Sequence, residues 1–284
     1  MPTLLLGLLS ISARAEIIVT DDLGDQLILT QPAKSIIALS PHLTELVFEA
    51  GAGSKLIARV DHADFPPEAE QIKSLGSFNN WNIEQVLALQ PDLVLIWLTA
   101  NGETPVKRLR QLGLNVYVSE PRVLSDISQT IRDIGVLANT SSQAEVRADN
   151  LDRGIDELRS NYSDKKLVDV FYQVWSEPLI TINGEQLISK VIKLCGGRNV
   201  FADLNTLAPV ITREGLLLAN PQIIIGGAQP DDHQSWLDQW QEWPEIDAVK
   251  SDNLYFINPD LLNRQTARML AGARKVCEYI QRAR

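Results

Sequence analysis

Aromatic side chains stand at the ends of predicted segments, and they are the residues in this sequence best suited to hold a ligand. Aromatic residues make up only 6% of the chain. In open α/β sheets, ligands bind beyond the carboxyl ends of the strands, and rings placed there supply flat apolar walls for a large planar ligand. The alternative for any one ring is packing inside the core. The four rings at such positions are Phe78, Trp81, Trp97 and Trp175.

The sequence lacks the common signatures of covalent catalysis. It contains neither the phosphate-binding G-x-x-x-x-G-K-[ST] motif nor the G-x-S-x-G nucleophile elbow. Its three histidines, His42, His62 and His233, have no spacing that makes a metal site by itself. The alternative is an α/β metal-dependent hydrolase, which would need histidines and carboxylates gathered from distant positions. We therefore expect a binding protein that is not an enzyme and holds no metal or cofactor.

Strands and helices are predicted to alternate through both halves of the chain. Short apolar runs bounded by proline or glycine are typical of buried strands, and apolar residues at helical spacing lie between them. This alternation indicates parallel sheets in an α/β fold. The predicted strands are residues 35–41, 56–60, 93–97, 116–118, 168–174, 223–225 and 254–257. The predicted helices include residues 42–50, 84–89, 106–112, 186–194 and 266–282.

A long amphipathic helix is predicted between the two halves, over residues 142–162. Ser142 and Glu145 have the spacing of a capping box, and the apolar residues that follow recur at steps of four and three, on one face. Such a helix could join two lobes as a rigid strut, or it could be an ordinary surface helix of one domain. The predicted division is an N-terminal α/β lobe at 16–140, a linking helix at 141–163 and a C-terminal α/β lobe at 164–284.

An internal echo supports two lobes of similar topology. Residues 83–95 and 213–225 both contain a glutamate, a short apolar helix, a proline seven residues after the glutamate and an apolar strand. The glutamates, Glu84 and Glu214, are 130 residues apart and would occupy equivalent helix starts. The simpler reading is that each carboxylate only stabilises the start of its own helix.

The net charge and the first fifteen residues indicate the partners and the cellular location of the protein. The net charge of −10 disfavours sequence-independent binding to nucleic acid. No apolar run reaches the roughly 18–20 residues that span a bilayer. Residues 4–12 form a shorter apolar run, and Ala13-Arg14-Ala15 is a small-x-small cleavage pattern. We expect residues 1–15 to be a signal peptide for export; the alternative is a buried N-terminal strand or helix.

The two cysteines, Cys195 and Cys277, are consistent with export. An even pair in an oxidising compartment predicts a disulfide, and two buried free thiols are the alternative. Their wide spacing excludes a C-x-x-C metal or redox site.

An ordered set of motifs resembles one known family from about Ser35 to the C-terminus. These motifs are Ser40-Pro41-x-x-Thr44-Glu45-Leu46, Asp64-Phe65-Pro66-Pro67, Leu75-Gly76-Ser77, the block 84–95, Cys195-Gly196-Gly197-Arg198-Asn199-Val200-Phe201 and Arg213-Glu214. Together they look like the periplasmic substrate-binding proteins of ABC importers for cobalamin, haem and iron-siderophores. The cysteine pair, the signal peptide and the long middle helix make the cobalamin-binding members the nearest match.

The resemblance implies two Rossmann-like lobes joined by one long rigid helix, with cobalamin carried in the cleft between them as transported ligand. It also implies a monomer in the periplasm. Permease arginines would dock on Glu84 and Glu214. Haem or an iron-siderophore is the alternative ligand. By family position, the cleft would be lined by Pro41, His42, His62, Phe78, Trp81, Trp97, Trp175, Asp260 and Arg264.

Three positions depart from the pattern usual among cobalamin binders. His62 stands where a tyrosine is usual, and Phe78 and Ala208 stand where tryptophans are usual. Histidine is a common ligand of haem and corrin metals, so His62 could either contact the metal or act as a hydrogen-bonding wall residue. Arg264 would donate to amide or phosphate oxygens of the ligand, with Asp260 holding it in place.

Overall fold

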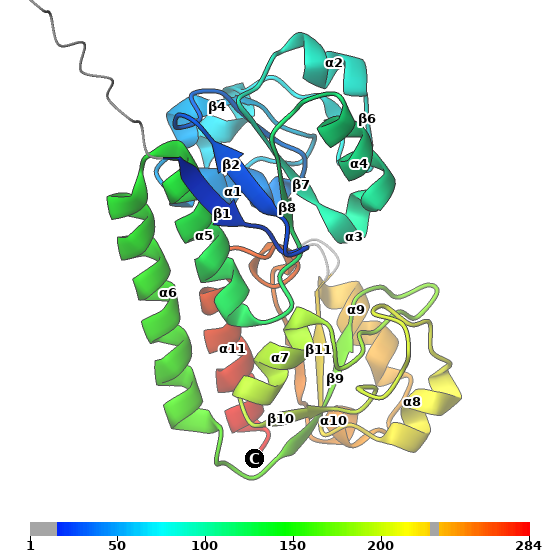
Figure 1. Ribbon diagram of the computed structural model, residues 1–284. Helices are drawn as coiled ribbons and strands as arrows, with labels where there is room; N and C mark the ends of the chain where they lie inside the picture. The colour runs from blue at the N-terminus through cyan, green and yellow to red at the C-terminus, as the bar shows by residue number, and fades with distance from the viewer. Residues whose placement is uncertain (1–15, 228–232) are drawn as a thin grey trace, which may run out of the picture.

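Parallel sheets organise both halves of the chain in the computed structural model, which describes residues 16–227 and 233–284 (Figure 1). The expected signal peptide, residues 1–15, lies outside the described residues. Within them, one four-stranded sheet has the order β4-β3-β7-β8 and another has the order β10-β9-β11-β12. We call the parts built on these sheets the N-terminal and C-terminal lobes. All neighbouring strands in both sheets run parallel.

The strands of the two sheets are short and almost entirely buried, as expected where helices cover both faces. The N-terminal sheet consists of β3 (Ile36–Ala38), β4 (Leu56–Ala58), β7 (Leu93–Trp97) and β8 (Val116–Ser119). The C-terminal sheet consists of β9 (Val168–Gln173), β10 (Gly197–Asn199), β11 (Ile223–Gly226) and β12 (Leu254–Phe256). Two antiparallel pairs lie outside these sheets: β1 (Ile17–Thr20) with β2 (Gln26–Leu29), and β5 (Gly76–Ser77) with β6 (Asn80–Trp81).

Helices connect the strands and cover the sheets. The N-terminal lobe contains α1 (Pro41–Glu49), α2 (Ile83–Ala88), α3 (Leu98–Asn101), α4 (Glu103–Gln111) and α5 (Leu124–Ala138). The C-terminal lobe contains α7 (Leu187–Leu194), α8 (Arg213–Ala219), α9 (His233–Gln241), α10 (Asp247–Lys250) and α11 (Met269–Arg282). Short 3₁₀ turns occur at Gly53–Lys55, Pro67–Gln71 and Pro259–Leu261.

The long helix α6 (Ser141–Tyr162) leads from the N-terminal to the C-terminal lobe, as its apolar periodicity predicts. It runs beside α5 and α11 along one side of the molecule (Figure 1). The predicted capping box is wrong: the N-cap is Thr140, whose side chain caps no backbone N–H. The helix therefore begins one residue before Ser142, which places that serine inside the first turn.

A single buried apolar cluster continues from one lobe to the other beneath α6. It contains Ile36 of β3, Ile127 of α5, Leu151 of α6, Val170 of β9 and Val276 of α11. The opposite face of each sheet has its own separate cluster. Packing against α6 thus joins the two lobes on one side only.

The disulfide predicted between Cys195 and Cys277 is confirmed. Cys195 is the C-cap residue of α7, and Cys277 lies inside α11. The bond therefore fixes the last helix of the chain to the helix that precedes β10.

Candidate functional site

The chain turns that follow the strands of the C-terminal sheet line a cavity of about 700 Å³. Val174 to Glu177 follow β9, Gly227 follows β11, and Pro259 comes shortly after β12. Residues at the carboxyl ends of parallel strands therefore line this cavity, and these strand ends are where open α/β sheets bind their ligands. Trp175 is its most prominent ring, with 63% of its surface exposed. Its indole Nε1 donates a 3.0 Å hydrogen bond to the carbonyl of Glu177, which holds the ring in place.

The N-terminal lobe gathers three of the predicted site residues around a fourth, Trp97, which is the last residue of β7. The imidazole of His42 meets the Trp97 ring edge-on, with their centroids 5.1 Å apart, and Phe78 lies 6.4 Å from the same ring. Asn101 links Trp81 to Trp97. The indole Nε1 of Trp81 donates to Asn101 Oδ1 at 2.7 Å, and Asn101 Nδ2 donates to the Trp97 carbonyl at 3.0 Å.

His42 supports this cluster from inside the protein. It follows Pro41, the first residue of α1, and only 4% of its surface is exposed. Its Nδ1 lies 3.0 Å from Ser40 Oγ. Burial, assisted by the positive charge of Arg264, lowers the pKa of His42 to about 3. The imidazole is therefore neutral at physiological pH and packs beneath Trp97.

His62 and Ala208, two of the positions that depart from the family pattern, both lie on exposed loops. His62 follows β4 and has a positive φ of 59°, which points its backbone out of the strand direction. The aromatic contacts among the described residues do not include His62.

Arg264 lies between the lobes and contacts three carboxylates. Its Nη1 donates to Glu45 at 2.9 Å and to Asp64 at 2.7 Å, both from the N-terminal lobe. Its Nε lies 3.1 Å from Asp260, the partner expected from the sequence. Arg268 adds a second contact to Glu45 at 3.2 Å and stacks over the ring of Phe65. These ion pairs join the middle of α1 and the loop that contains Asp64 to the segment before α11.

The helix α1 carries two acidic side chains into this seam. The Glu45 and Glu49 side chains are 0% and 7% exposed. Burial raises the pKa of Glu45, against the opposing effect of Arg264 and Arg268. Burial also raises the pKa of Glu49 to about 7, although its carboxylate accepts a 3.1 Å hydrogen bond from the backbone N–H of Ala267.

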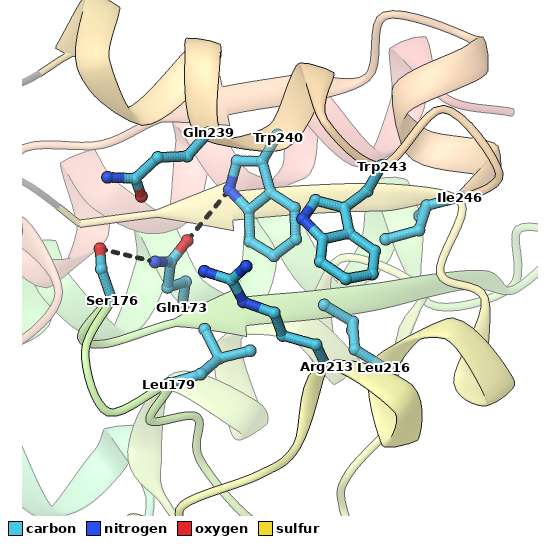
Figure 2. Close-up of a pocket in the computed structure, with 9 residues that line it drawn as sticks. All are labelled: Gln173, Ser176, Leu179, Arg213, Leu216, Gln239, Trp240, Trp243 and Ile246. Carbon is cyan, nitrogen blue, oxygen red and sulfur yellow. Dashed lines mark hydrogen bonds between the residues drawn. The ribbon is translucent and has the colours of Figure 1, made fainter.

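Several lining residues of the C-terminal lobe were absent from the sequence prediction. Gln173, the last residue of β9, accepts hydrogen bonds at Oε1 from the indoles of Trp236 and Trp240, at 2.6 Å and 3.1 Å. Beside the large cavity, Gln173 also lines a small pocket in which Arg213 lies over the Trp243 ring (Figure 2). The strand-end rule that singled out Trp175 applies equally to Gln173.

The two glutamates of the internal echo occupy matching positions. Glu84 is exposed in the first turn of α2, and Glu214 is exposed in the first turn of α8. Asn82 caps the first helix by accepting from the backbone N–H of Glu84 at 2.7 Å, and Thr212 caps the second by accepting from that of Gly215 at 3.0 Å. The two helices lie in different lobes, far apart on the molecule (Figure 1).

The described residues contain neither a metal-binding cluster nor a membrane-spanning helix. No group of three or more histidine, cysteine, aspartate or glutamate side chains in that part of the chain is arranged to hold a metal ion. None of the helices there combines the length and the apolar character needed to cross a membrane.

Comparison with known proteins gives a consistent result. The family model described as "Periplasmic binding protein" matches residues 36–261. The chain is 33% identical over 253 residues to a vitamin B12-binding protein of Vibrio cholerae, covering 88% of this chain and 90% of the relative. It is 30% identical over 250 residues to a vitamin B12-binding protein of Yersinia pestis, covering 88% and 87%.

Solved structures agree with this comparison. The crystal structure of the periplasmic vitamin B12-binding protein of Vibrio cholerae has a TM-score of 0.83 at 33% identity, covering 89% of this chain and 98% of that one. A periplasmic haem-binding protein of Vibrio cholerae, at 17% identity and a TM-score of 0.74, shares the fold and covers 86% of this chain and 97% of that one. The family model, the sequence identity and the shared fold all lead to the same assignment. The chain belongs to the periplasmic binding protein family.

Proposed function

We propose that this protein binds cobalamin in the cleft between its lobes and delivers it to the permease of an ABC importer. The observation that carries the proposal is the pair of aromatic walls at the strand ends. The Trp97 cluster stands on the N-terminal lobe, and Trp175 lines a cavity of about 700 Å³ on the C-terminal lobe. Identity of about one third to vitamin B12-binding proteins over most of the chain supports the same ligand.

The residue types suit a corrinoid. A corrin is a broad ring with amide arms, so it needs apolar walls and a modest number of hydrogen-bonding groups. Phe78, Trp81, Trp97 and Trp175 supply rings, and His42 supports Trp97 from behind. Pro41, His62, Asp260 and Arg264 complete the proposed ligand-binding set. The charge of Arg264 is already balanced by its carboxylate partners, which suits an uncharged ligand arm better than an anion.

Delivery and location follow from the same proposal. Residues 1–15 would direct export and be removed, leaving a monomer in the periplasm. Glu84 and Glu214, one on each lobe, would contact the permease. Their exposure in the first turns of α2 and α8 leaves both carboxylates accessible.

The test is isothermal titration of the purified protein with cyanocobalamin and, separately, with haem. We expect one cobalamin site per chain. Replacing the exposed Trp175 by alanine should weaken binding by about 1–3 kcal/mol if its ring packs on the ligand. The control is Leu218→Ala, which removes an apolar side chain that is 89% exposed and lies on α8. Binding of haem with no binding of any corrinoid would contradict the proposal.

A further inference from the structure

Three apolar side chains stand side by side where the C-terminal lobe carries the large cavity. Trp175 and Ile180 form an antiparallel bridge, and Ile180 forms another with Val210. The backbone groups of Trp175 and Ile180 exchange hydrogen bonds of 3.4 Å and 3.0 Å. Residues directly opposed in an antiparallel pair project from the same face, with their Cβ atoms about 5 Å apart. We call Trp175, Ile180 and Val210 the apolar strip.

Neighbouring residues fix the direction in which the strip faces. Leu179 and Ile211, each next in the chain to a strip residue, pack against the buried cluster confined to the C-terminal lobe. Side chains alternate in direction along extended backbone, so Ile180 and Val210 point away from that cluster. Trp175 and Val210 are each 63% exposed, and Ile180 is half-buried between them. The strip is therefore an exposed apolar surface.

The strip continues the wall of the binding cleft. Trp175, at one end, lines the cavity of about 700 Å³. Val210, at the other end, comes shortly after Leu207, which lines a small pocket between the lobes together with Trp97 of the N-terminal lobe. The carbonyl of Leu207 accepts a 3.1 Å hydrogen bond from the backbone N–H of Asn183, in the same antiparallel ladder. The strip thus reaches from the cavity to the segment that meets the opposite lobe.

The chemistry of the strip suits packing against an apolar ligand surface. Single exposed apolar side chains are common in soluble proteins, whereas contiguous groups of them mark binding surfaces. Ile180 and Val210 are β-branched and therefore stiff, so covering them costs little side-chain entropy. The one polar group among the three side chains is the indole N–H of Trp175, which already donates to the carbonyl of Glu177. A ligand that covers the strip would therefore leave no polar group of these side chains unpaired.

We propose that Ile180 and Val210 extend the ring of Trp175 into one continuous apolar wall, which packs on the corrinoid and contributes to its affinity. The inference rests on the proposed function. The rim of a corrin ring carries methyl groups between its amide arms, and these supply the apolar surface that such a wall can cover. A ligand that presents charged groups at the same place would be disfavoured, because those groups would lose water without gaining a partner.

The experiment measures cyanocobalamin binding by isothermal titration at several temperatures. Val210→Ser removes the apolar end of the strip, and we expect binding about 5–20-fold weaker than in the wild type. Because less apolar surface is then buried, the heat capacity change on binding should become less negative. Val210→Ile keeps an apolar β-branched side chain and should bind within about twofold of the wild type.

Val146→Ser is the matched control. Val146 has the same exposed fraction as Val210, 63%, and lies on α6, outside the cavities described. Its replacement should leave both the affinity and the heat capacity change of binding as they are in the wild type. Urea unfolding of the three variants should give midpoints close to that of the wild type, since both valines are exposed.

Wild-type affinity and an unchanged heat capacity change in Val210→Ser would overturn the extended wall while leaving the proposed function standing. An equal loss of affinity in Val146→Ser would overturn it too, because the effect would then not depend on the strip. Failure of the wild type to bind any corrinoid would contradict the proposed function itself.

Discussion

Individual side chains of α1 do more to join the lobes than to face the cleft. His42 packs beneath Trp97, while Glu45 meets Arg264 and Arg268, and Glu49 accepts from the backbone of Ala267. His42, Glu45 and Glu49 lie on successive turns of α1, the helix that follows β3. The seam between the lobes therefore depends on buried ionisable groups, and stability should respond to pH.

Glu49 allows the most direct test at this scale. Its pKa is raised by burial from 4.5 to about 7, with Arg147 and Glu45 as the charged groups near it. A carboxyl whose pKa is raised by folding contributes stability below its unfolded value, and that contribution is lost as pH rises through the folded value. Between pH 4.5 and pH 7 the loss should reach about 3 kcal/mol.

The variant Glu49→Gln should lack this loss, because the amide stays neutral and can still accept from Ala267. Urea unfolding at pH 5 and pH 8 would measure the difference. We expect the free energy of unfolding to fall less between these pH values in the variant than in the wild type. Identical pH dependence in the two proteins would show that folding does not raise the pKa of Glu49.

The four rings proposed for the site could be predicted from the sequence, but the polar groups that surround them could not. Trp97 and Trp175 were identifiable because each stands at the end of an apolar run, a local pattern. The contacts of Arg264 with Glu45 and Asp64 join residues about 200 positions apart, and no local pattern encodes which carboxylate an arginine will meet. The burial of His42 also depends on tertiary packing.

At the scale of elements, strong periodicity was the best guide. The predicted strands and the long helix all appear, with boundaries displaced by a few residues. Nothing was predicted at α5, although Leu124, Ile127, Ile131 and Ile134 recur at helical spacing and are buried. The predicted start of the last helix at residue 266 came too early, because the backbone N–H of Thr266 bonds to the carbonyl of Arg264 in a turn.

The disulfide between α7 and α11 should contribute substantially to stability. It closes a sequence separation of 82 residues, for which the chain-entropy model gives about 4.5 kcal/mol. The double variant Cys195→Ser/Cys277→Ser should lose about that much free energy of unfolding in urea. The single serine variants would serve as controls for the substituted side chains. A double variant within 1 kcal/mol of the wild type would mean that packing alone fixes α11.

The whole molecule combines a shared core with two separate outer surfaces. One apolar cluster continues through α6 into both lobes, and Arg264 and Arg268 reinforce the seam from the cleft side. This construction should resist large hinge motion. A permease would therefore meet two surfaces held at a nearly fixed separation, and the matching glutamates of α2 and α8 are placed one on each surface.

Charge reversal tests whether those glutamates dock. Glu84→Arg and Glu214→Arg should each leave cobalamin affinity within twofold of wild type, because neither residue lines the cavities described. Each should reduce ATP-driven uptake in vesicles that contain the permease, since placed charges across an interface set register and association rate. The double variant should be most impaired. Matched controls are Glu68→Arg and Glu245→Arg, exposed glutamates of the N-terminal and C-terminal lobes, which change the net charge equally. Normal uptake by the double variant would leave both glutamates with only their role at the helix starts.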